Sequence, residues 1–468
     1  MRTTSELADK FSLELIGDAE IEISSVSINT QHLGENSLFI AVQGANSHGL
    51  DHLETAIAQG AVAVLSDRKI ELSIPSLYHP NPRLIAGQLA SEVYETAASN
   101  MLLYAVTGTN GKTSTVFFLR ELLDAVGQSA GLISSAFSRV GQNVLPADLT
   151  TPEAPRTHQL LSQMRDSQQF SAAIEASAQG LSRHRLDGLR FRIAGFTNLS
   201  RDHLDDYPDM DSYLAAKAQL FTEDLSDRAV VFLGDDHSHS LYESISIPKV
   251  AIGKEYQFSF ESGNLKISGK AELSARINIS SLMAKNLGLA IVMLLEDGYA
   301  PDKLERALAL IDTSVPGRLQ RVSLSKPAVF VDYAHTPAAV EASAKELSKD
   351  FDELTIVLSA SGNRDAGKRP EMAKAAALHA NRIVVTDQHP RDEEPAQIRS
   401  EVISGLEAFE DFVEVADPAE AISRAIEMTS QNGAVLWCGP GHLKYREIRG
   451  QKIAFDAIAT AREALGDD

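Results

Sequence analysis

The chain has 468 residues, with 43 Lys and Arg against 64 Asp and Glu, so its formal net charge is −21. At about 150 residues per domain, this length predicts roughly three domains. The acidic balance argues against nonspecific nucleic-acid binding, which needs a basic surface. The single cysteine, Cys438, excludes an internal disulfide framework and a cysteine-cluster zinc site. No signal peptide and no apolar run of about 20 residues is present, so we expect a cytoplasmic protein without membrane insertion.

Short apolar runs separated by helical patterns predict three α/β units with mainly parallel sheets. The first unit spans 1–98, with a polar linker at 95–100, and the second spans 99–316, with a hinge at 315–317 before the third, 317–468. The expected strands are 37–42, 61–65, 101–106, 170–176, 191–196, 229–233, 328–331, 354–358, 382–386 and 434–438. The expected helices include 52–59, 114–125, 212–221 and 282–295.

A glycine-rich segment joins the second unit's first strand to a helix start. Glycines let backbone N–H groups approach phosphate oxygens, and the helix N-terminus adds a favourable dipole. Lys112 would reach the outer phosphates and Thr113 would bind Mg²⁺, although Val106 replaces the first glycine of the usual phosphate-loop pattern. We therefore predict a nucleotide site here rather than an ordinary turn; its residues are Gly108, Thr109, Asn110, Gly111, Lys112, Thr113 and Ser114.

Polar residues gather just after the predicted strands of the second and third units. Ligands of open parallel sheets bind beyond the carboxyl ends of strands, so these residues predict a cleft between two domains. Glu175 and His203 could complete a magnesium site with Thr113. Lys217, in a helical stretch, is by itself typical of a solvated lysine. The strand-end residues are Glu175, Asn198, Arg201, Asp202, His203, Asp332, His335, Asn363, Arg364, Asp365, His389, Arg391 and His442.

Taken together, these motifs resemble the Mur ligase family. The segments TGTNGKTS (107–114), NLSRDHLDDY (198–207), AAKAQLF (215–221), VPGRLQRV (315–322) and VDYAHTP (331–337) occur in the family's order. The resemblance covers the chain from residue 27 onward. Further segments resemble the E-type branch: LTTPEA (149–154), EASAQGLSRHR (175–185), NRDAGKRPEM (363–372), HPRDEEP (389–395) and CGPGH (438–442).

The resemblance implies a UDP-binding domain, a central ATP-binding domain with a P-loop-type parallel sheet, and a Rossmann-like domain that binds an amino acid. It implies an ATP-dependent, ADP-forming ligase that adds a diamino acid to UDP-N-acetylmuramoyl-L-Ala-D-Glu through an acyl phosphate. That step belongs to peptidoglycan precursor synthesis, on which cell shape and division depend. The implied partners are these small molecules, and the family expectation for assembly is a monomer.

The resemblance also assigns residues to ligands. ATP would contact the glycine-rich loop together with Asn286, Arg318 and Asp332. Mg²⁺ would be bound by Thr113, Glu175, His203 and a carbamylated Lys217, and the catalytic residues would be Lys112, Lys217 and His203. The muramoyl-dipeptide would contact Thr30, Thr150, Thr151, Ser177, Arg183 and Arg185, and the amino acid would contact Arg364, Gln388, His389, Arg391, Gly439 and Leu443.

The chain departs from the family pattern in two kinds of place. Thr30 and Gln31 stand where the UDP domain usually has Ser-Arg, and Gln179 stands where a histidine is usual. In the amino-acid pocket, Gln388 and Leu443 replace acidic residues of diaminopimelate-adding members. A buried ammonium group without a partner is costly. We therefore expect L-lysine, L-ornithine or L-2,4-diaminobutyrate rather than meso-diaminopimelate, with the acids Asp387, Asp392 and Glu393 as candidate partners for the distal amine.

Two other functions remain open from the sequence. One is a related amide ligase of the folylpolyglutamate or cyanophycin type, against which the TTPEA and SRHR segments argue. The other is a nucleotide-binding partner protein that has lost catalysis, which the changes at Gln31, Gln179 and Leu443 would permit. Every residue assigned to ATP and magnesium is nevertheless present.

Overall fold

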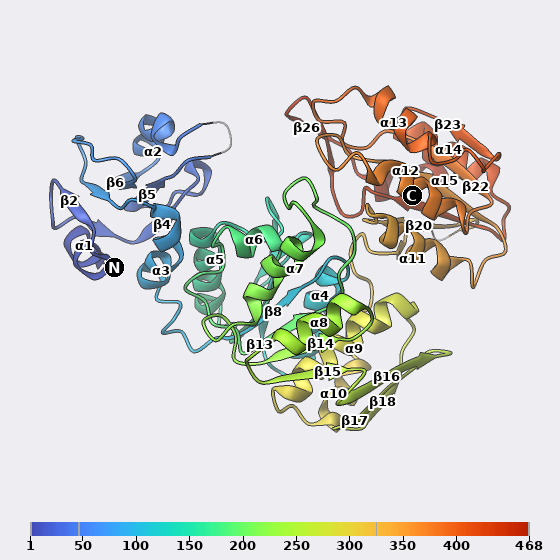
Figure 1. Ribbon diagram of the computed structural model, residues 1–468, viewed down its shortest axis with the longest axis horizontal. Coiled ribbons are helices and arrows are strands. Elements are labelled where there is room, and N and C mark those ends of the chain that lie inside the picture. Colours follow the sequence, from blue (N-terminus) through green and yellow to red (C-terminus); the bar gives the residue numbers. More distant parts are fainter. Residues whose placement is uncertain (1, 45–46, 324, 467–468) are drawn as a thin grey trace.

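Three large sheets, one in each domain, organise the structure (Figure 1). The computed structural model describes residues 2–44, 47–323 and 325–466. In Figure 1 the first domain (blue) and the third domain (orange to red) lie on two sides of the central domain. Among the described residues no helix is long and apolar enough to cross a membrane.

The first domain is built on a five-stranded sheet in the order β2-β7-β6-β5-β4. Every residue of β5 is buried, as expected for an apolar run between two neighbouring strands. Both predicted strands and the predicted helix are present. The elements are β1 (Arg2–Thr3), α1 (Thr4–Phe11), β2 (Glu14–Ile16), β3 (Glu22–Ile23), β4 (Ser25–Ser27), a 3₁₀ turn (Thr30–His32), β5 (Ser37–Ala41), a second 3₁₀ turn (Gly49–His52), α2 (Leu53–Ala58), β6 (Ala61–Ser66), β7 (Ser76–Tyr78) and α3 (Pro82–Tyr94).

The central domain contains an eleven-stranded sheet in the order β11-β10-β9-β12-β8-β13-β14-β15-β16-β17-β18. Its strands are β8 (Leu102–Thr107), β9 (Ala130–Ile133), β10 (Phe137–Val140), β11 (Asn143–Pro146), β12 (Ser171–Glu175), β13 (Ile193–Phe196), β14 (Ala229–Phe232), β15 (Lys249–Ile252), β16 (Tyr256–Glu261), β17 (Asn264–Gly269) and β18 (Leu273–Arg276). Its helices are α4 (Lys112–Ala125), α5 (Ala154–Asp166), α6 (Ala178–Ser182), α7 (Met210–Ala218), a 3₁₀ turn (Gln219–Phe221), α8 (Asp236–Ser244), α9 (Ser281–Glu296) and α10 (Pro301–Leu308).

This central sheet is parallel only from β9 to β16, and its two ends are antiparallel hairpins. The expectation of a mainly parallel sheet is therefore confirmed, and the antiparallel pairs lie at the two edges, away from the strands that carry the site. Strands β16 and β17 alternate between buried and exposed residues, which is typical of an antiparallel pair with one solvated face. That alternation was visible in the sequence and was missed.

The third domain has a six-stranded sheet in the order β19-β20-β24-β21-β22-β23. Only β19 pairs antiparallel, so all four predicted strands lie in the parallel part. The elements are β19 (Gln320–Arg321), β20 (Ala328–Asp332), α11 (Pro337–Leu347), β21 (Leu354–Leu358), α12 (Lys368–Ala377), β22 (Arg382–Val385), α13 (Pro395–Ile403), β23 (Phe412–Glu414), α14 (Pro418–Met428), β24 (Ala434–Cys438), β25 (Tyr445–Ile448), β26 (Gln451–Ala454) and α15 (Ala457–Leu465). Cys438 is a free, buried thiol.

Ion pairs join the third domain to the segment that follows β13. Arg201 lies 2.7 Å from Glu371 and 3.3 Å from Asp365, and Lys368 Nζ lies 3.1 Å from Asp202 Oδ1. On the other side of the central domain, α3 packs on α5. The ion pairs fix the third domain over the carboxyl ends of the central strands, and the packing of α3 on α5 joins the first domain to the central domain.

We expect Ile356→Ala to lower the free energy of unfolding of the third domain by about 2–5 kcal/mol, because the fully buried Ile356 side chain leaves a cavity in the core. The matched control is Leu378→Ala, which removes an exposed side chain of the same domain. Trp437, the only tryptophan of the chain, is fully buried in this domain, so its fluorescence during urea unfolding reports on the domain directly. Equal midpoints for the two variants would contradict the packing described here.

Candidate active site

The glycine-rich loop between β8 and α4 is held by close contacts that exclude larger residues. A Cβ on Gly108, whose φ is +143°, would lie 1.9 Å from Thr197 Oγ1, and one on Gly111 would lie 2.3 Å from Asn286 Oδ1. The loop is also tied to the next strand along the sheet, because Asn198 accepts hydrogen bonds from the backbone N–H groups of Thr109 and Asn110 at 2.9 and 3.1 Å. The predicted loop and its neighbour Asn286 are therefore one packed unit.

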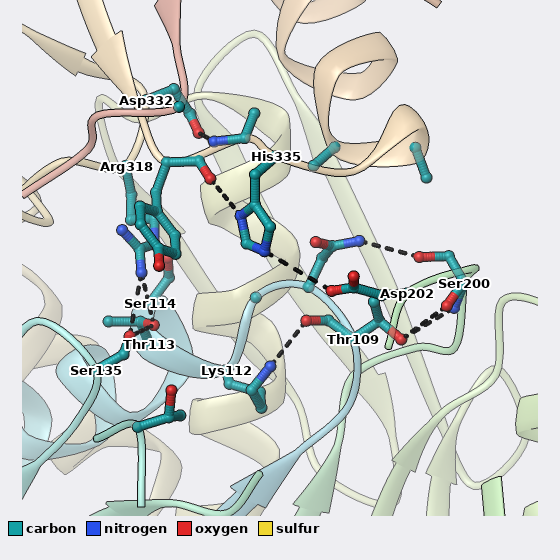
Figure 2. Close-up of a pocket in the computed structure, with 18 of the residues that line it drawn as sticks. Thr109, Lys112, Thr113, Ser114, Ser135, Ser200, Asp202, Arg318, Asp332 and His335 are labelled. Atoms are coloured by element: carbon teal, nitrogen blue, oxygen red, sulfur yellow. Dashed lines mark hydrogen bonds and ion pairs between the residues drawn. The ribbon is translucent and has the colours of Figure 1, made fainter. Parts of the chain in front are cut away.

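Two lysines meet beneath this loop. Lys112 Nζ donates to the carbonyl oxygens of Gly108 and Thr109 at 3.1 and 2.8 Å (Figure 2). Lys217 Nζ donates to the same Gly108 oxygen at 2.8 Å and lies 4.1 Å from the centre of the Tyr213 ring. Lys217 is 1% exposed, so its interpretation as a solvated lysine is wrong. Burial and then the charge of Lys112 lower the pKa of Lys217 well below the usual value.

An oxygen-rich cluster lies at the start of α4. Thr113 Oγ1 donates to Glu175 Oε2 at 3.0 Å, and the Ser135 backbone N–H donates to the same oxygen at 2.9 Å. Arg318 Nη2 donates to the hydroxyls of Thr113 and Ser135 at 3.0 and 3.3 Å (Figure 2). The Arg318 guanidinium also stacks over the Tyr333 ring at 4.5 Å. Residues from two domains thus converge on one hydroxyl.

A buried carboxylate lies on the other side of the loop. Asp202 is 5% exposed and lies 3.1 Å from Lys368, 3.5 Å from His203 Nε2 and 3.7 Å from His335 Nε2 (Figure 2 shows His335). Burial alone would raise the pKa of Asp202, but the hydrogen bond and charge of His335, followed by the charges of His203 and Lys368, keep it well below its usual range.

His203 is held between two partners. Gln179 Nε2 donates to its Nδ1 at 2.7 Å, so a neutral ring carries its proton on Nε2, facing Asp202. Burial lowers the pKa of His203 to about 4, and the ring is therefore neutral at physiological pH.

These groups line one cavity of about 640 Å³ between the central and third domains. Most of the predicted site residues meet there, although they come from distant parts of the chain. The predicted residues that line it are Thr109, Asn110, Gly111, Lys112, Thr113, Ser114, Thr150, Glu175, His203, Asn286, Arg318, Asp332, Arg364, Gln388, His389, Arg391, Gly439 and Leu443.

Seven predicted residues do not line this cavity. Gly108 and Lys217 lie behind the loop, as described above. Thr151 Oγ1 donates to the Glu175 carbonyl oxygen at 2.8 Å, and buried Arg185 forms an ion pair with Glu153 at 3.0 Å. The remaining residues outside the lining are Thr30 in a 3₁₀ turn of the first domain, Ser177 at the N-cap of α6, and the exposed Arg183 paired with Asp206.

The lining residues that sequence reasoning missed include Ser135, Tyr333 and Glu447. Ser135 follows β9, which was not among the predicted strands, so its strand-end position was hidden. Tyr333 lies within the VDYAHTP segment and was passed over in favour of its neighbours. Glu447 lies on the β25–β26 hairpin, which carries no motif.

The fold and the cavity define a nucleotide-dependent α/β enzyme whose site lies between domains. Three family models match the chain: Mur ligase family, catalytic domain (residues 22–108), Mur ligase middle domain (106–291) and Mur ligase, glutamate ligase domain (317–441). The chain is 37% identical over 492 aligned residues to "UDP-N-acetylmuramyl-tripeptide synthetase" of Leifsonia xyli subsp. xyli, covering 99% of this chain and 96% of the relative. The chain belongs to the Mur ligase family, and it is an ATP-dependent, ADP-forming ligase.

Solved structures agree with this assignment. A structure titled "UDP-N-acetylmuramoyl-L-alanyl-D-glutamate--2,6-diaminopimelate ligase" superimposes with a TM-score of 0.66 at 26% identity, over 100% of this chain and 99% of the other. Folylpolyglutamate synthase of Mycobacterium tuberculosis complexed with ADP gives a TM-score of 0.64 at 18% identity, over 82% and 93% of the two chains. The second similarity shows a shared fold alone and is the more distant one.

Acidification between pH 6.5 and about 4 should lower the melting temperature. The folded-state pKa of His203 is about 4, below its ordinary value of 6.5, so the unfolded chain binds more protons in this window and stability falls as pH falls. An asparagine side chain does not titrate here, and it tolerates the positive φ of 56°. Over this pH range the melting temperature of His203→Asn should therefore fall by about 2–4 °C less than that of the parent protein. Calorimetry at pH 7.5, 6.5, 5.5 and 4.5 measures the melting temperatures of both proteins. Parallel curves of melting temperature against pH would contradict the neutral state of His203.

Proposed function

We propose that the protein adds a diamino acid to UDP-N-acetylmuramoyl-L-Ala-D-Glu in peptidoglycan precursor synthesis. The observation that carries the proposal is the single cavity, in which the glycine-rich loop of the central domain faces the third-domain arginines Arg364 and Arg391. A phosphate-binding loop opposite two carboxylate-binding groups suits a reaction between a nucleotide and an amino acid. The names of the relatives described above support the same substrate class.

The proposed reaction has two steps. The terminal carboxylate of the dipeptide attacks the γ-phosphorus of ATP, which forms an acyl phosphate and releases ADP. The amine of the incoming amino acid then attacks the acyl carbon, and the tetrahedral intermediate loses phosphate and a proton to give the amide. Negative charge accumulates around the transferring phosphoryl group, so the site needs preorganised cations. Lys112 and Arg318 are the cations of the chain that line this part of the cavity.

ATP would replace contacts that the loop now makes with itself. Lys112 donates to two loop carbonyl oxygens here, and phosphate oxygens are stronger acceptors for the same ammonium group. Asn286 packs against the loop, and Asp332, whose carboxylate accepts from the backbone N–H groups of Leu319 and Ala334, lines the cavity on the third-domain side. The ribose of ATP would lie toward Asp332.

The residues of the oxygen-rich cluster fit Mg²⁺. Thr113 Oγ1 and Glu175 Oε2 lie 3.0 Å apart, and Mg²⁺ prefers oxygen ligands with few protein contacts. Among the described residues no group of three His, Cys, Asp or Glu side chains could hold a metal, so the set depends on the Thr113 hydroxyl and on Lys217 as a carbamate. For His203 to act as a ligand, its Nδ1 would have to release Gln179 Nε2 and bind the metal in its place. When bound, Mg²⁺ neutralises phosphate charge.

The muramoyl-dipeptide would enter beside the central domain's Thr150, which lines the cavity, with Thr151, Ser177 and Arg185 supporting that wall. Its UDP end would extend to the first domain near Thr30. The 3₁₀ turn that holds Thr30 touches the cavity rim, because His32 Nε2 lies 3.3 Å from Asp148 Oδ2 and Asp148 lines the cavity. Arg183, the exposed C-cap residue of α6, would contact the nucleotide-peptide only after release from Asp206.

The first test is phosphate release from ATP and Mg²⁺ with UDP-N-acetylmuramoyl-L-Ala-D-Glu and a panel of amino acids. We expect release with L-lysine, L-ornithine or L-2,4-diaminobutyrate to exceed release with meso-diaminopimelate by about tenfold or more. The reason is that uncharged Gln388 and Leu443 are a poor match for the second ammonium–carboxylate pair of meso-diaminopimelate. Release only with diaminopimelate would keep the ligase and refute this preference. No release with any amine would favour another acyl acceptor or the catalytically inactive partner.

We expect Lys217 to take up CO₂ as a carbamate near neutral pH, because burial favours the neutral, nucleophilic amine. After incubation with ¹³C-bicarbonate, NMR should show a carbamate carbonyl signal in the parent protein and none in Lys217→Ala. The control is Lys285→Ala, which removes an exposed lysine from the cavity wall. A signal that survives in Lys217→Ala would refute the assignment.

A further inference from the structure

The third-domain wall of the cavity is rich in positive charge. Arg364, Lys368, Arg369 and Arg391 all line it. Such a wall suits the carboxylate of an amino acid, but the distal ammonium group of a diamino acid would be repelled unless an acid faces it. Which acid faces the ammonium group is therefore the next question, and the inference that answers it rests on the proposed function.

The three acids proposed from the sequence are not free to take that role. Asp387 accepts a hydrogen bond from Arg399 and does not line the cavity. Glu393 forms an ion pair with the almost fully buried Arg369 at 2.8 Å, and it too is absent from the lining. Asp392 is exposed and outside the cavity. The expectation that one of them replaces the missing charge is therefore contradicted by their positions.

One other carboxylate faces this wall. Among the described residues that line the cavity, the third domain contributes two acids, Asp332 on the nucleotide side and Glu447 on strand β25. Glu447 is held at both main chain and side chain: its backbone N–H donates to His389 Nδ1 at 3.0 Å, and its Oε2 accepts from Arg391 Nε at 3.1 Å. Its side chain is 36% exposed, so the carboxylate can accept further hydrogen bonds.

The neighbours of Glu447 suit the rest of a diamino acid. Leu443 and Tyr445 line the same wall and offer apolar surface for methylene groups. Gln388 is 3% exposed, and its Oε1 has no hydrogen-bond partner, so this buried amide adds a polar but uncharged group. Of the two third-domain acids among the described residues that line the cavity, Glu447 is the one that shares strand β25 with Tyr445.

We propose that Glu447 is the specificity-determining residue of the amino-acid pocket and that its carboxylate binds the distal ammonium group of the added diamino acid. Gln388 and Leu443 carry no negative charge. Glu447 supplies that charge from the β25–β26 hairpin, which lies outside the two motifs that contain them. Arg391 contacts the same carboxylate, so it is positioned to bind the α-carboxylate of the amino acid beside the ammonium group. Recognition of the two ends of the substrate is coupled through this one ion pair.

The test compares each substrate with its analogue lacking the distal amine: norleucine for lysine, norvaline for ornithine, or 2-aminobutyrate for 2,4-diaminobutyrate. Glu447→Gln keeps the size and the hydrogen bond to Arg391 but removes the charge. We expect it to raise KM for the preferred diamino acid about tenfold or more, with a much smaller rise for the analogue, so that the preference collapses. Glu447→Asp, which keeps the charge, should retain most of the preference. Asp392→Asn is the control and should leave both KM values unchanged.

Three results would overturn the proposal. An equal rise of both KM values in Glu447→Gln would mean that Glu447 acts only by positioning Arg391. An unchanged preference in that variant would exclude Glu447 from recognition while leaving the ligase intact. A loss of preference in Asp392→Asn would move recognition to that residue. If the parent protein released no phosphate with the muramoyl-dipeptide and any amine, the proposed function would fall and this inference with it.

Discussion

The buried carboxylate of Asp202 joins the two halves of the active site. It belongs to the central domain, yet two of its three basic neighbours, Lys368 and His335, belong to the third domain. A buried carboxylate is stable as a charge only where such partners surround it. Removing the third domain would leave that charge with His203 alone, so the closed arrangement and the ionised Asp202 depend on each other. The cavity proposed to receive ATP and the amino acid exists because the domains meet at this point.

Positive charge is crowded on the other side of the same loop. Lys112 and Lys217 share the carbonyl oxygen of Gly108; Lys217 is buried, and Lys112 is partly buried at the cavity wall. Two cations at one acceptor cannot both keep ordinary proton affinity, and Lys217, which does not line the cavity, is the one whose pKa falls furthest. The geometry of the proposed phosphate-binding loop therefore also favours the neutral amine of Lys217 behind it. One crowded carbonyl oxygen links nucleotide binding to the chemistry proposed for Lys217.

The proposed amino-acid pocket combines residues from elements that lie far apart in the chain. Arg391 follows β22, where the sequence places a motif, but its carboxylate partner Glu447 comes from the β25–β26 hairpin 56 residues later. Of the acids near Arg391 in the chain, Asp387 pairs with Arg399 and Glu393 pairs with Arg369. Closeness in the sequence therefore did not predict closeness in the pocket, because side chains that follow a parallel strand point in different directions.

The sequence by itself determined the elements that carry the site. Apolar runs such as 354–358 and 434–438 match β21 and β24, because a buried parallel strand needs continuous apolar residues, and the loop 108–114 follows from its glycines and lysine. It did not determine burial and pairing. Lys217 is typical of a solvated helix residue until packing under the loop buries it, and Glu447 has no motif at all. These properties depend on contacts between residues far apart in the chain, which local pattern does not encode and only the tertiary structure decided.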